Sequence, residues 1–585
     1  MKNYDEYLNK CIERALDKQI TSSKSVLHEV GKILRETCAN KKYAIWGSGD
    51  HTIQLHKYFS LEMKDAEFII DNDRSKDGKK FLEFDIKYPS IDILKELDVI
   101  FISSFSCAEA IEKQIEGMNI DVVAINIYKK LAEKGINLKS AFYSDTSVYI
   151  ELYNHKKLYE QTHDEKLLEE IILKYLEIRD MTNAKIYMKL YIDNNYSKRE
   201  KVLVLLNEIE KLEDSIKEEI NNRKENNIFL FYWDALRYKD IFSQNTPMKY
   251  IKEKLNNSTY FTNLYSPSIT TYESVPSILT GKDPKDDDIK DGITVDEEQC
   301  EFIKNAQQQG YKIKIYSNHW NIIDGKNIEY FDGNYATLTI WNAIYDMIKN
   351  EYDKNLYILY FWQETHPPHL CGSHTHLPVA HLAPFSGNKS EAQTQEAYTA
   401  QYIECLKYVD DVTKYYYNIL GDKLLKILFS DHGQVVEEAT FNLNEINSLA
   451  GWHDDRIHVP LIFTGGNIHT KKITGLNTLM NFNKMMNQVL DGQQIELKEE
   501  NYVFFRFSKM ENSIIIKKYL EAGLDDYLYG FTGYINDVYK YIVTGNCKTR
   551  CYLKNTDEEI IDEKKVGKIK QEFVKKSKLK RTYSR

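Results

Sequence analysis

The sequence predicts an α/β protein with a smaller sheet near its N-terminus, a helical segment, and a larger sheet toward its C-terminus. Short apolar strands alternate with helical stretches between residues 41 and 104, no strand pattern occurs in 142–222, and longer apolar strands alternate with helices from 228 onward. Such alternation is typical of parallel sheets with right-handed crossovers. At 585 residues the chain also exceeds the roughly 100–200 residues of an ordinary domain. We expect divisions at 1–140, 141–227, 228–560 and 561–585, the last a solvated basic tail.

Composition excludes several classes of protein. A hydrophobic content of 42% with 12% aromatic residues is enough for packed cores and argues against global disorder. The net charge of −10 argues against a nucleic-acid partner. The N-terminus is charged throughout, and no window approaches the roughly 18 apolar residues of a membrane span, so we expect no transmembrane segment and a cytoplasmic location. The eight cysteines have neither disulfide-framework nor zinc-ribbon spacing, which favours reduced thiols.

The first predicted unit opens with an amphipathic helix over residues 1–40, followed by a strand that ends in a glycine turn. Gly47 and Gly49 follow the strand in "KKYAIWGSGDHT", and Asp71 ends the next strand in "EFIIDND". In a Rossmann-like unit such a turn binds phosphate and such an aspartate binds ribose. The third glycine of the motif is missing, so a tight turn with a structural aspartate is an equal alternative. The pattern resembles small Rossmann-like domains of bacterial surface-polysaccharide enzymes, which implies a sugar or nucleotide-linked ligand.

Residues 141–227 show Leu, Ile and Tyr at three- and four-residue spacing and predict helical hairpins that serve as a spacer or docking arm. Beyond them, four strands end in polar residues: "IFLFYWD", "YKIKIYSN", "LYILYFWQETH" and "LLKILFSDHG". Ligands of open parallel sheets lie beyond the carboxyl ends of the strands. Asp234, His366, Asp431 and His432 should therefore meet at one edge of the larger sheet.

These elements resemble the alkaline phosphatase/sulfatase superfamily over residues 228–560. The resemblance rests on "DALR" at a strand end, a Thr ten residues before the glycine of "SILTG", a His-rich strand end, "SDHG", and a later His before "HVPLIF". It implies a mixed sheet flanked by helices and a metal site formed by Asp234, Thr271, Asp431 and His432. In the family pattern Thr271 is the nucleophile, with Thr270 the neighbouring alternative.

The resemblance also places histidines in the site. His453, with a strand-end histidine, would serve a second metal or the leaving group, and His366 best matches the family residue that binds the transferred group. His369 and His374 of "HLCGSH" compete with it for that role. For His376 and His381 we favour exposed loop positions.

Departures from the family pattern narrow the expected activity. Sulfatases use Cys or Ser followed by x-Pro-x-Arg, which becomes formylglycine, and oxygen-rich calcium ligands; this chain has Thr271 and Val275 in the motif and His432 after Asp431. Imidazole with carboxylate favours zinc or manganese. We therefore disfavour a sulfatase.

The nearer resemblance is to phosphoethanolamine and phosphoglycerol transferases such as lipoteichoic acid synthase, in which a Thr carries the phospho-group. It implies transfer of a phosphoethanolamine, phosphoglycerol or phosphoramidate-like group to a bacterial surface glycan such as capsule, from a nucleotide-linked or lipid donor. A phosphodiesterase or phosphatase acting through the same Thr271 intermediate is the alternative.

Overall fold

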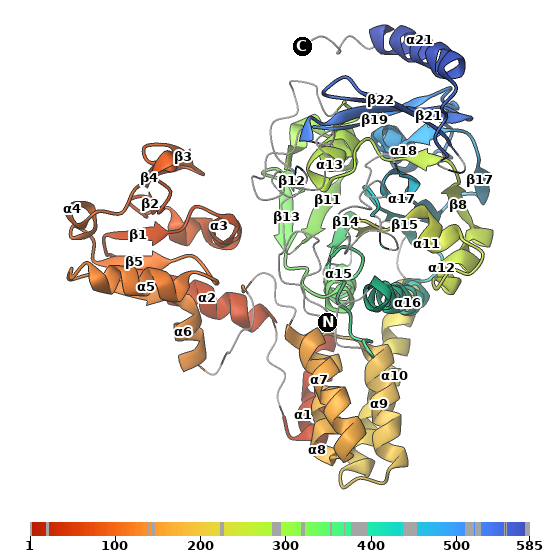
Figure 1. Cartoon of the computed structure of the whole chain (residues 1–585). Coiled ribbons are helices and arrows are strands. Elements are labelled where there is room, and N and C mark those ends of the chain that lie inside the picture. Colours follow the sequence, from red (N-terminus) through yellow and green to blue (C-terminus); the bar gives the residue numbers. More distant parts are fainter. Residues whose placement is uncertain are drawn as a thin grey trace. The chain divides into compact units, whose positions relative to one another are not determined.

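The computed structural model describes part of the chain, in the residue ranges 3–18, 23–134, 136, 141–142, 147–222, 227–283, 294–317, 322–350, 354–367, 369–375, 395–434, 436, 453–508, 520, 528–554, 556 and 558–579. They form two compact units (Figure 1). One is Lys18–Glu151, and the other combines Met1–Asp17 with Leu152–Arg585.

The unit Lys18–Glu151 is built on a parallel sheet. Its elements in chain order are α2 (Ser23–Cys38), β1 (Tyr43–Trp46), α3 (Asp50–Met63), β2 (Ile69–Ile70), η1 (Arg74–Lys76), β3 (Lys80–Phe81), β4 (Phe84–Lys87), α4 (Ile91–Leu94), β5 (Val99–Ile102), α5 (Ala108–Gly117), β6 (Val123–Asn126) and α6 (Ile127–Glu133). The strand order is β3-β4-β2-β1-β5-β6, and only the β3–β4 pair is antiparallel. Both faces of the central strands are buried, so β1, β2 and β5 are continuously apolar. The strand order reverses between β1 and β5, which places the glycine turn after β1 at this point.

The first predicted helix does not belong to this sheet. The described residues 3–18 and 23–40 contain α1 (Tyr4–Leu16) and α2, and α1 lies in the other unit beside α8 (Glu165–Glu177) and α10 (Arg199–Asn221) (Figure 1). Asp5 at its start accepts hydrogen bonds from Arg179 and Trp341. We expected the helical segment to be a separate division of the chain, but from Leu152 onward it belongs to the same compact unit as the C-terminal part. Its helices are α7 (Ser147–Thr162), α8, α9 (Met181–Asp193) and α10. Amphipathic periodicity predicts a helix but does not say which core its apolar face covers.

The larger unit contains an eight-stranded mixed sheet in the order β13-β11-β14-β7-β15-β16-β8-β17. Its strands are β7 (Asn227–Trp233), β8 (Ser258–Phe261), β11 (Tyr311–Tyr316), β13 (Ile328–Phe331), β14 (Lys354–Phe361), β15 (Leu425–Phe429), β16 (Leu461–Thr464) and β17 (Lys471–Ile473). The four predicted strands β11, β14, β7 and β15 are adjacent and parallel. This confirms the expected mixed sheet.

Helices cover both faces of the sheet, because alternate side chains of the central strands are apolar on each side. Ile228, Leu230 and Tyr232 of β7 belong to one core, while Phe231 on the opposite face contacts Tyr417 of α16. The helices of this unit are α11 (Tyr238–Phe242), α12 (Lys249–Lys254), α13 (Thr271–Thr280), α14 (Glu301–Gln308), α15 (Ala336–Lys349), α16 (Gln395–Leu420), α17 (Asp454–Ile457) and α18 (Phe482–Leu490). Short elements complete it: η2 (Leu255–Asn257), β9 (Leu264–Tyr265), β10 (Val295–Asp296), η3 (Glu297–Gln299), β12 (Ile323–Asp324), β18 (Asn477–Thr478) and η5 (Leu479–Asn481).

The C-terminal region differs from the solvated basic tail that we expected at residues 561–585. A four-stranded antiparallel sheet, β19 (Val503–Phe507), β20 (Phe531–Ile535), β21 (Tyr539–Thr544) and β22 (Thr549–Leu553), is followed by helix α21 (Glu563–Leu579). Ile569 and Phe573 of this helix are buried against Tyr534 and Tyr541. The segment that we expected to be a solvated basic tail is therefore folded over most of its length, because two apolar residues one helical turn apart outweigh the surrounding lysines.

In the described part of the chain no helix is long and apolar enough to cross a membrane.

The packing of α21 can be tested by substitution. Phe573→Ala should cost about 3–5 kcal/mol of local stability, since it removes a buried ring from a small apolar core. Hydrogen exchange should then show loss of amide protection in α21. The neighbouring Val574→Ala, whose side chain is 38% exposed, is the control and should leave the protection unchanged; equal protection in both variants would contradict the packing.

Candidate active site

Two aspartates meet at the edge of the larger sheet because two neighbouring strands end in register. Tyr232 of β7 pairs with Phe429 of β15, and the strands run parallel. Asp234 and Asp431 each lie two residues beyond this pair, so the two carboxylates extend from the same edge. Both are buried, with relative exposures of 1% and 0%.

His432 completes a compact cluster with these carboxylates. Its Nε2 lies 3.6 Å from Asp234 Oδ1 and 3.6 Å from Asp431 Oδ2. One ligand atom from each of the three residues lies within 4.8 Å of the others. The cluster therefore has the donor types and spacing that a divalent cation requires.

Hydrogen bonds fix the orientation of the carboxylates. Tyr360 donates to Asp234 Oδ2 at 2.6 Å, and Ser274 donates to Asp431 Oδ2 at 2.9 Å. Within the described residues, the buried Oδ1 atoms of both aspartates have no hydrogen-bond partner. Burial and the neighbouring charge of Asp431 raise the pKa of Asp234 to about 8. Two buried carboxylates this close repel each other, and a bound cation would remove that cost.

Thr271 is the first residue of α13 and points toward the same cluster. Its Oγ1 lies 3.0 Å from His432 Nε2. His432 Nδ1 lies 2.8 Å from the Gly433 carbonyl oxygen, which can only accept, so Nδ1 carries the proton and the Thr271 hydroxyl donates to Nε2. The adjacent Thr270 is the N-cap residue of α13 and makes no side-chain cap. The helix N-terminus adds a partial positive charge where Thr271 lies, which favours an anionic substrate group.

Sequence reasoning missed Ser274 and Tyr360, and both had a usable signal. Ser274 follows Thr271 by three residues, so the two lie on one face of a helix. Tyr360 pairs with Tyr232 on the neighbouring strand, close to the end of β7. A polar side chain near the end of a buried strand can reach a metal ligand that follows the neighbouring strand, and Tyr360 has this position relative to Asp234.

The histidines proposed from sequence occupy different places. The His366 ring lies 6.4 Å from the His432 ring, and its Nδ1 is 2.9 Å from the Pro367 carbonyl oxygen. Removal from water lowers the pKa of His366. His369 instead packs in the interior against Tyr398 and Tyr402, where burial lowers its pKa well below the usual range.

Two further histidines lie outside the carboxylate cluster. His374 belongs to a separate group with Cys371 and Cys405. His453 is the N-cap of α17, where its Nδ1 accepts a hydrogen bond from the Asp455 amide at 3.1 Å. His376 and His381 fall outside the residues that the structure describes.

The segment that carries His453 is held directly against the His432 loop. The Gly433 amide donates to the Arg456 carbonyl oxygen at 2.8 Å. A Cβ atom on Gly433 would lie 2.0 Å from the Asp455 carbonyl oxygen, so only glycine permits this approach. Asp455 in turn pairs with Arg237 of "DALR", 3.2 Å away, and Arg237 also pairs with Asp240. The "DALR" arginine thus holds α17 close to the site.

The glycine turn of the other unit has its own set of contacts. Gly47 has a φ of +126°, and a Cβ there would lie 2.7 Å from the Ser103 carbonyl oxygen, whereas space beside Gly49 is open. Asp71 pairs with Lys76 at 3.0 Å, and Ser48 donates to the same carboxylate. Asp71 is thus engaged inside the unit, while the turn lies where the strand order reverses.

Comparison with known proteins finds a family model that matches the segment holding the carboxylate cluster. Residues 226–492 match the Sulfatase family model. No curated protein matches the chain.

Among solved structures, a 2-O GAG sulfatase has 14% identity and a TM-score of 0.43, covering 60% of this chain and 90% of its own. A phosphonate monoester hydrolase from Silicibacter pomeroyi has 10% identity and a TM-score of 0.43, with coverages of 60% and 95%. A protein of the alkaline phosphatase superfamily from Vibrio parahaemolyticus has 13% identity and a TM-score of 0.38, with coverages of 64% and 97%.

Enzymes of this family use divalent metals, and the residues present fit such an ion. In tetrahedral coordination with bonds of about 2.0–2.2 Å, ligand atoms lie about 3.3–3.6 Å apart. The separations measured from His432 Nε2 are 3.0 Å to Thr271 Oγ1 and 3.6 Å to each aspartate. Two carboxylates, an imidazole and a hydroxyl are donor types that bind divalent metal ions.

Removing ligands should remove this metal. Asp431→Asn combined with His432→Ala takes away an anionic ligand and the imidazole, so the metal content should fall by about one equivalent per chain. Elemental analysis after reconstitution measures it. Asp410→Asn changes another buried carboxylate, which accepts backbone hydrogen bonds from Tyr250 and Ile251, and should retain full content. Equal content in both variants would contradict the assignment.

The close approach at Gly433 gives a second test. Gly433→Ala should push α17 away from the His432 loop and weaken metal binding by about 10–100-fold, the range for residues that orient ligands. Gly567→Ala, where a Cβ meets nothing within 4 Å, should bind metal as the wild type does. Titration with a metal-competing chelator gives both affinities, and an unchanged affinity for Gly433→Ala would show that the contact is unimportant.

Proposed function

We propose that the chain is a metal-dependent enzyme that transfers a substituted phospho-group through a covalent intermediate on Thr271. The observation that carries the proposal is the contact of Thr271 Oγ1 with the Asp234, Asp431 and His432 cluster. Thr cannot be converted to formylglycine as Cys or Ser can, which favours phosphoryl over sulfuryl chemistry. The match of residues 226–492 to the Sulfatase family supports the broader enzyme class.

In the first half of the proposed reaction, the Thr271 hydroxyl loses its proton to solvent and its Oγ forms a bond to phosphorus. The bond from phosphorus to the leaving-group oxygen breaks at the same time, and that oxygen takes up a proton from solvent. A divalent metal would supply positive charge that lowers the pKa of the hydroxyl and offsets charge on the phosphoryl oxygens. Ser274 and Tyr360 keep the aspartates in place through their hydrogen bonds. The α13 N-terminus faces the anionic group.

In the second half, an acceptor oxygen displaces Thr271 from phosphorus, and the acceptor proton must be removed. His366 suits this role, because its Nδ1 proton is held by the Pro367 carbonyl oxygen and its lowered pKa keeps Nε2 free to take up a proton. We propose a sugar hydroxyl of a bacterial surface glycan as acceptor and a nucleotide-linked or lipid donor, with the reaction in the cytoplasm. Water as acceptor would make the protein a phosphodiesterase or phosphatase.

We also propose that the unit Lys18–Glu151 binds a phosphate-bearing ligand at the Gly47–Gly49 turn. The reversal of strand order between β1 and β5 supports this, since ligands of doubly wound sheets bind at that point. Asp71 would hold Lys76 and Ser48 in place beside the bound ligand and would not contact the ligand itself. Calorimetric titration of the full chain with nucleotides and nucleotide sugars tests it, and flat traces throughout would favour a purely structural turn.

The nucleophile can be identified by mass. Incubation with phosphodiester donors and no acceptor should add the donated group to the peptide containing Thr271. Thr271→Ala should abolish this adduct and reduce turnover by several orders of magnitude, because the covalent route is lost. Thr270→Ala removes the neighbouring hydroxyl, which makes no capping hydrogen bond to α13, and should remain active. An active Thr271→Ala would overturn the mechanism, and an adduct formed only from sulfate esters would favour a sulfatase.

The role of His366 is tested separately. His366→Ala should lower turnover by about 10²–10⁴-fold, the range for a positioned acid or base, while the Thr271 adduct still forms. Comparing adduct decay with and without a glycan acceptor distinguishes transfer from hydrolysis. Unchanged decay in His366→Ala would exclude the assigned role.

A further inference from the structure

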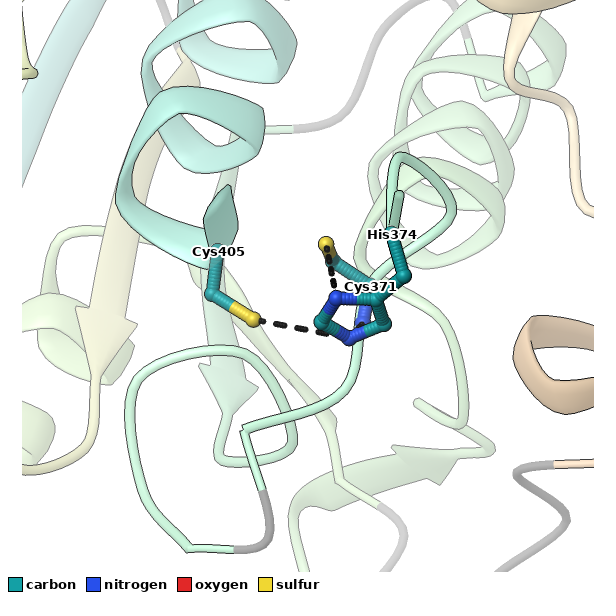
Figure 2. Close-up of side chains that lie close together, drawn as sticks. All are labelled: Cys371, His374 and Cys405. Atoms are coloured by element: carbon teal, nitrogen blue, oxygen red, sulfur yellow. Dashed lines mark hydrogen bonds between the residues drawn. The ribbon is translucent and has the colours of Figure 1, made fainter. Parts of the chain in front are cut away.

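A second group of metal-binding side chains lies outside the carboxylate cluster. Cys371 and His374 come from the loop after β14, and Cys405 comes from helix α16; their side chains point toward one another (Figure 2). All three are buried, with exposures of 0%, 1% and 0%. One ligand atom from each lies within 4.8 Å of the others, and both thiols are free.

The contacts of His374 fix its protonation. Its Nδ1 lies 3.0 Å from a carboxylate oxygen of Glu404, which accepts, so Nδ1 carries the proton. Its Nε2 accepts a hydrogen bond from the Cys371 amide at 3.0 Å and lies 3.9 Å from Cys405 Sγ. A carboxylate that holds the far nitrogen of an imidazole is the common support for a histidine ligand, because it fixes the ring and leaves the other lone pair for the metal.

Two cysteine sulfurs with an imidazole form a soft donor set, which suits zinc better than magnesium or calcium. We propose that Cys371, Cys405 and His374 Nε2 bind a zinc ion, with Glu404 orienting the imidazole and a fourth ligand from outside these side chains. The separation of 3.9 Å between Cys405 Sγ and His374 Nε2 is close to the roughly 3.6 Å expected around tetrahedral zinc. Cys371 Sγ now lies 3.9 Å from Nδ1 of the same ring, so its side chain has to turn toward Nε2 when zinc binds. On binding, zinc replaces the Cys371 amide as partner of Nε2, and that amide can then donate to a thiolate.

This site would anchor the loop that carries His366. The loop is already attached at Gly372, whose carbonyl oxygen accepts hydrogen bonds from Lys156 at 3.0 Å and Tyr175 at 2.7 Å. Zinc would add a link from the same loop to α16. The inference does not depend on the proposed function, since none of its ligands belongs to the carboxylate cluster.

Metal analysis of the full-length protein tests the inference. After reconstitution with zinc, Cys371→Ser and Cys405→Ser should each lose about one metal equivalent per chain relative to wild type. Cys300→Ser, which alters another fully buried cysteine, should lose none. Asp431→Asn with His432→Ala should keep the cysteine-bound metal, so failure of one site is distinguishable from failure of the other. Equal zinc content in wild type, Cys371→Ser and Cys405→Ser would overturn the inference.

A measurement on the wild type avoids variants that fail to fold. Cobalt(II) bound by thiolates gives intense charge-transfer absorption in the near ultraviolet, whereas cobalt bound by carboxylates and imidazole does not. We expect this absorption on cobalt loading and its loss on addition of zinc. Stoichiometric cobalt without the absorption, or a Cys371–Cys405 disulfide in the protein purified under reducing conditions, would contradict the zinc site.

Discussion

The close approach of two buried carboxylates is the constraint on which the active-site region depends. Parallel pairing of β7 with β15 brings Asp234 beside Asp431, and burial makes an uncompensated pair costly. Hydrogen bonds that Tyr360 and Ser274 donate to the carboxylates reduce this cost. His432 lies beside both carboxylates, and the Thr271 hydroxyl is hydrogen-bonded to its imidazole. A cation bound between the two carboxylates, the imidazole and the hydroxyl would offset the repulsion between the carboxylates.

A second set of contacts keeps the geometry of this cluster constant. Arg237 binds Asp240 and Asp455, which ties the turn after β7 to α17. Gly433 allows α17 to approach the His432 loop closely. These contacts lie behind the ligands rather than among them, and they account for the Arg of "DALR" and the Gly of "SDHG" without assigning either a role in the reaction. The geometry of the cluster thus depends on residues that are not among its candidate ligands.

The sequence predicted the four strands β11, β14, β7 and β15, their parallel direction and the polar residues at their ends, because apolar runs and strand-end positions are local features. It did not predict that α1 packs with the C-terminal unit or that α21 covers a sheet, since both depend on long-range contacts. The Cys371, His374 and Cys405 group was missed for the same reason: Cys405 lies far along the chain from the other two and is brought near by α16. Ser274 and Tyr360 could have been predicted from their positions in the sequence. They were missed because they hydrogen-bond the aspartates and are not themselves part of the family motifs.

The central claim is that Asp234, Asp431, His432 and Thr271 bind a metal that activates Thr271. Anomalous diffraction from crystals of the zinc-reconstituted protein, recorded on both sides of the zinc absorption edge, tests it most directly. We predict a strong zinc peak within bonding distance of His432 Nε2, both aspartates and Thr271 Oγ. A well-ordered site without such a peak, with these side chains in the positions described, would contradict the account.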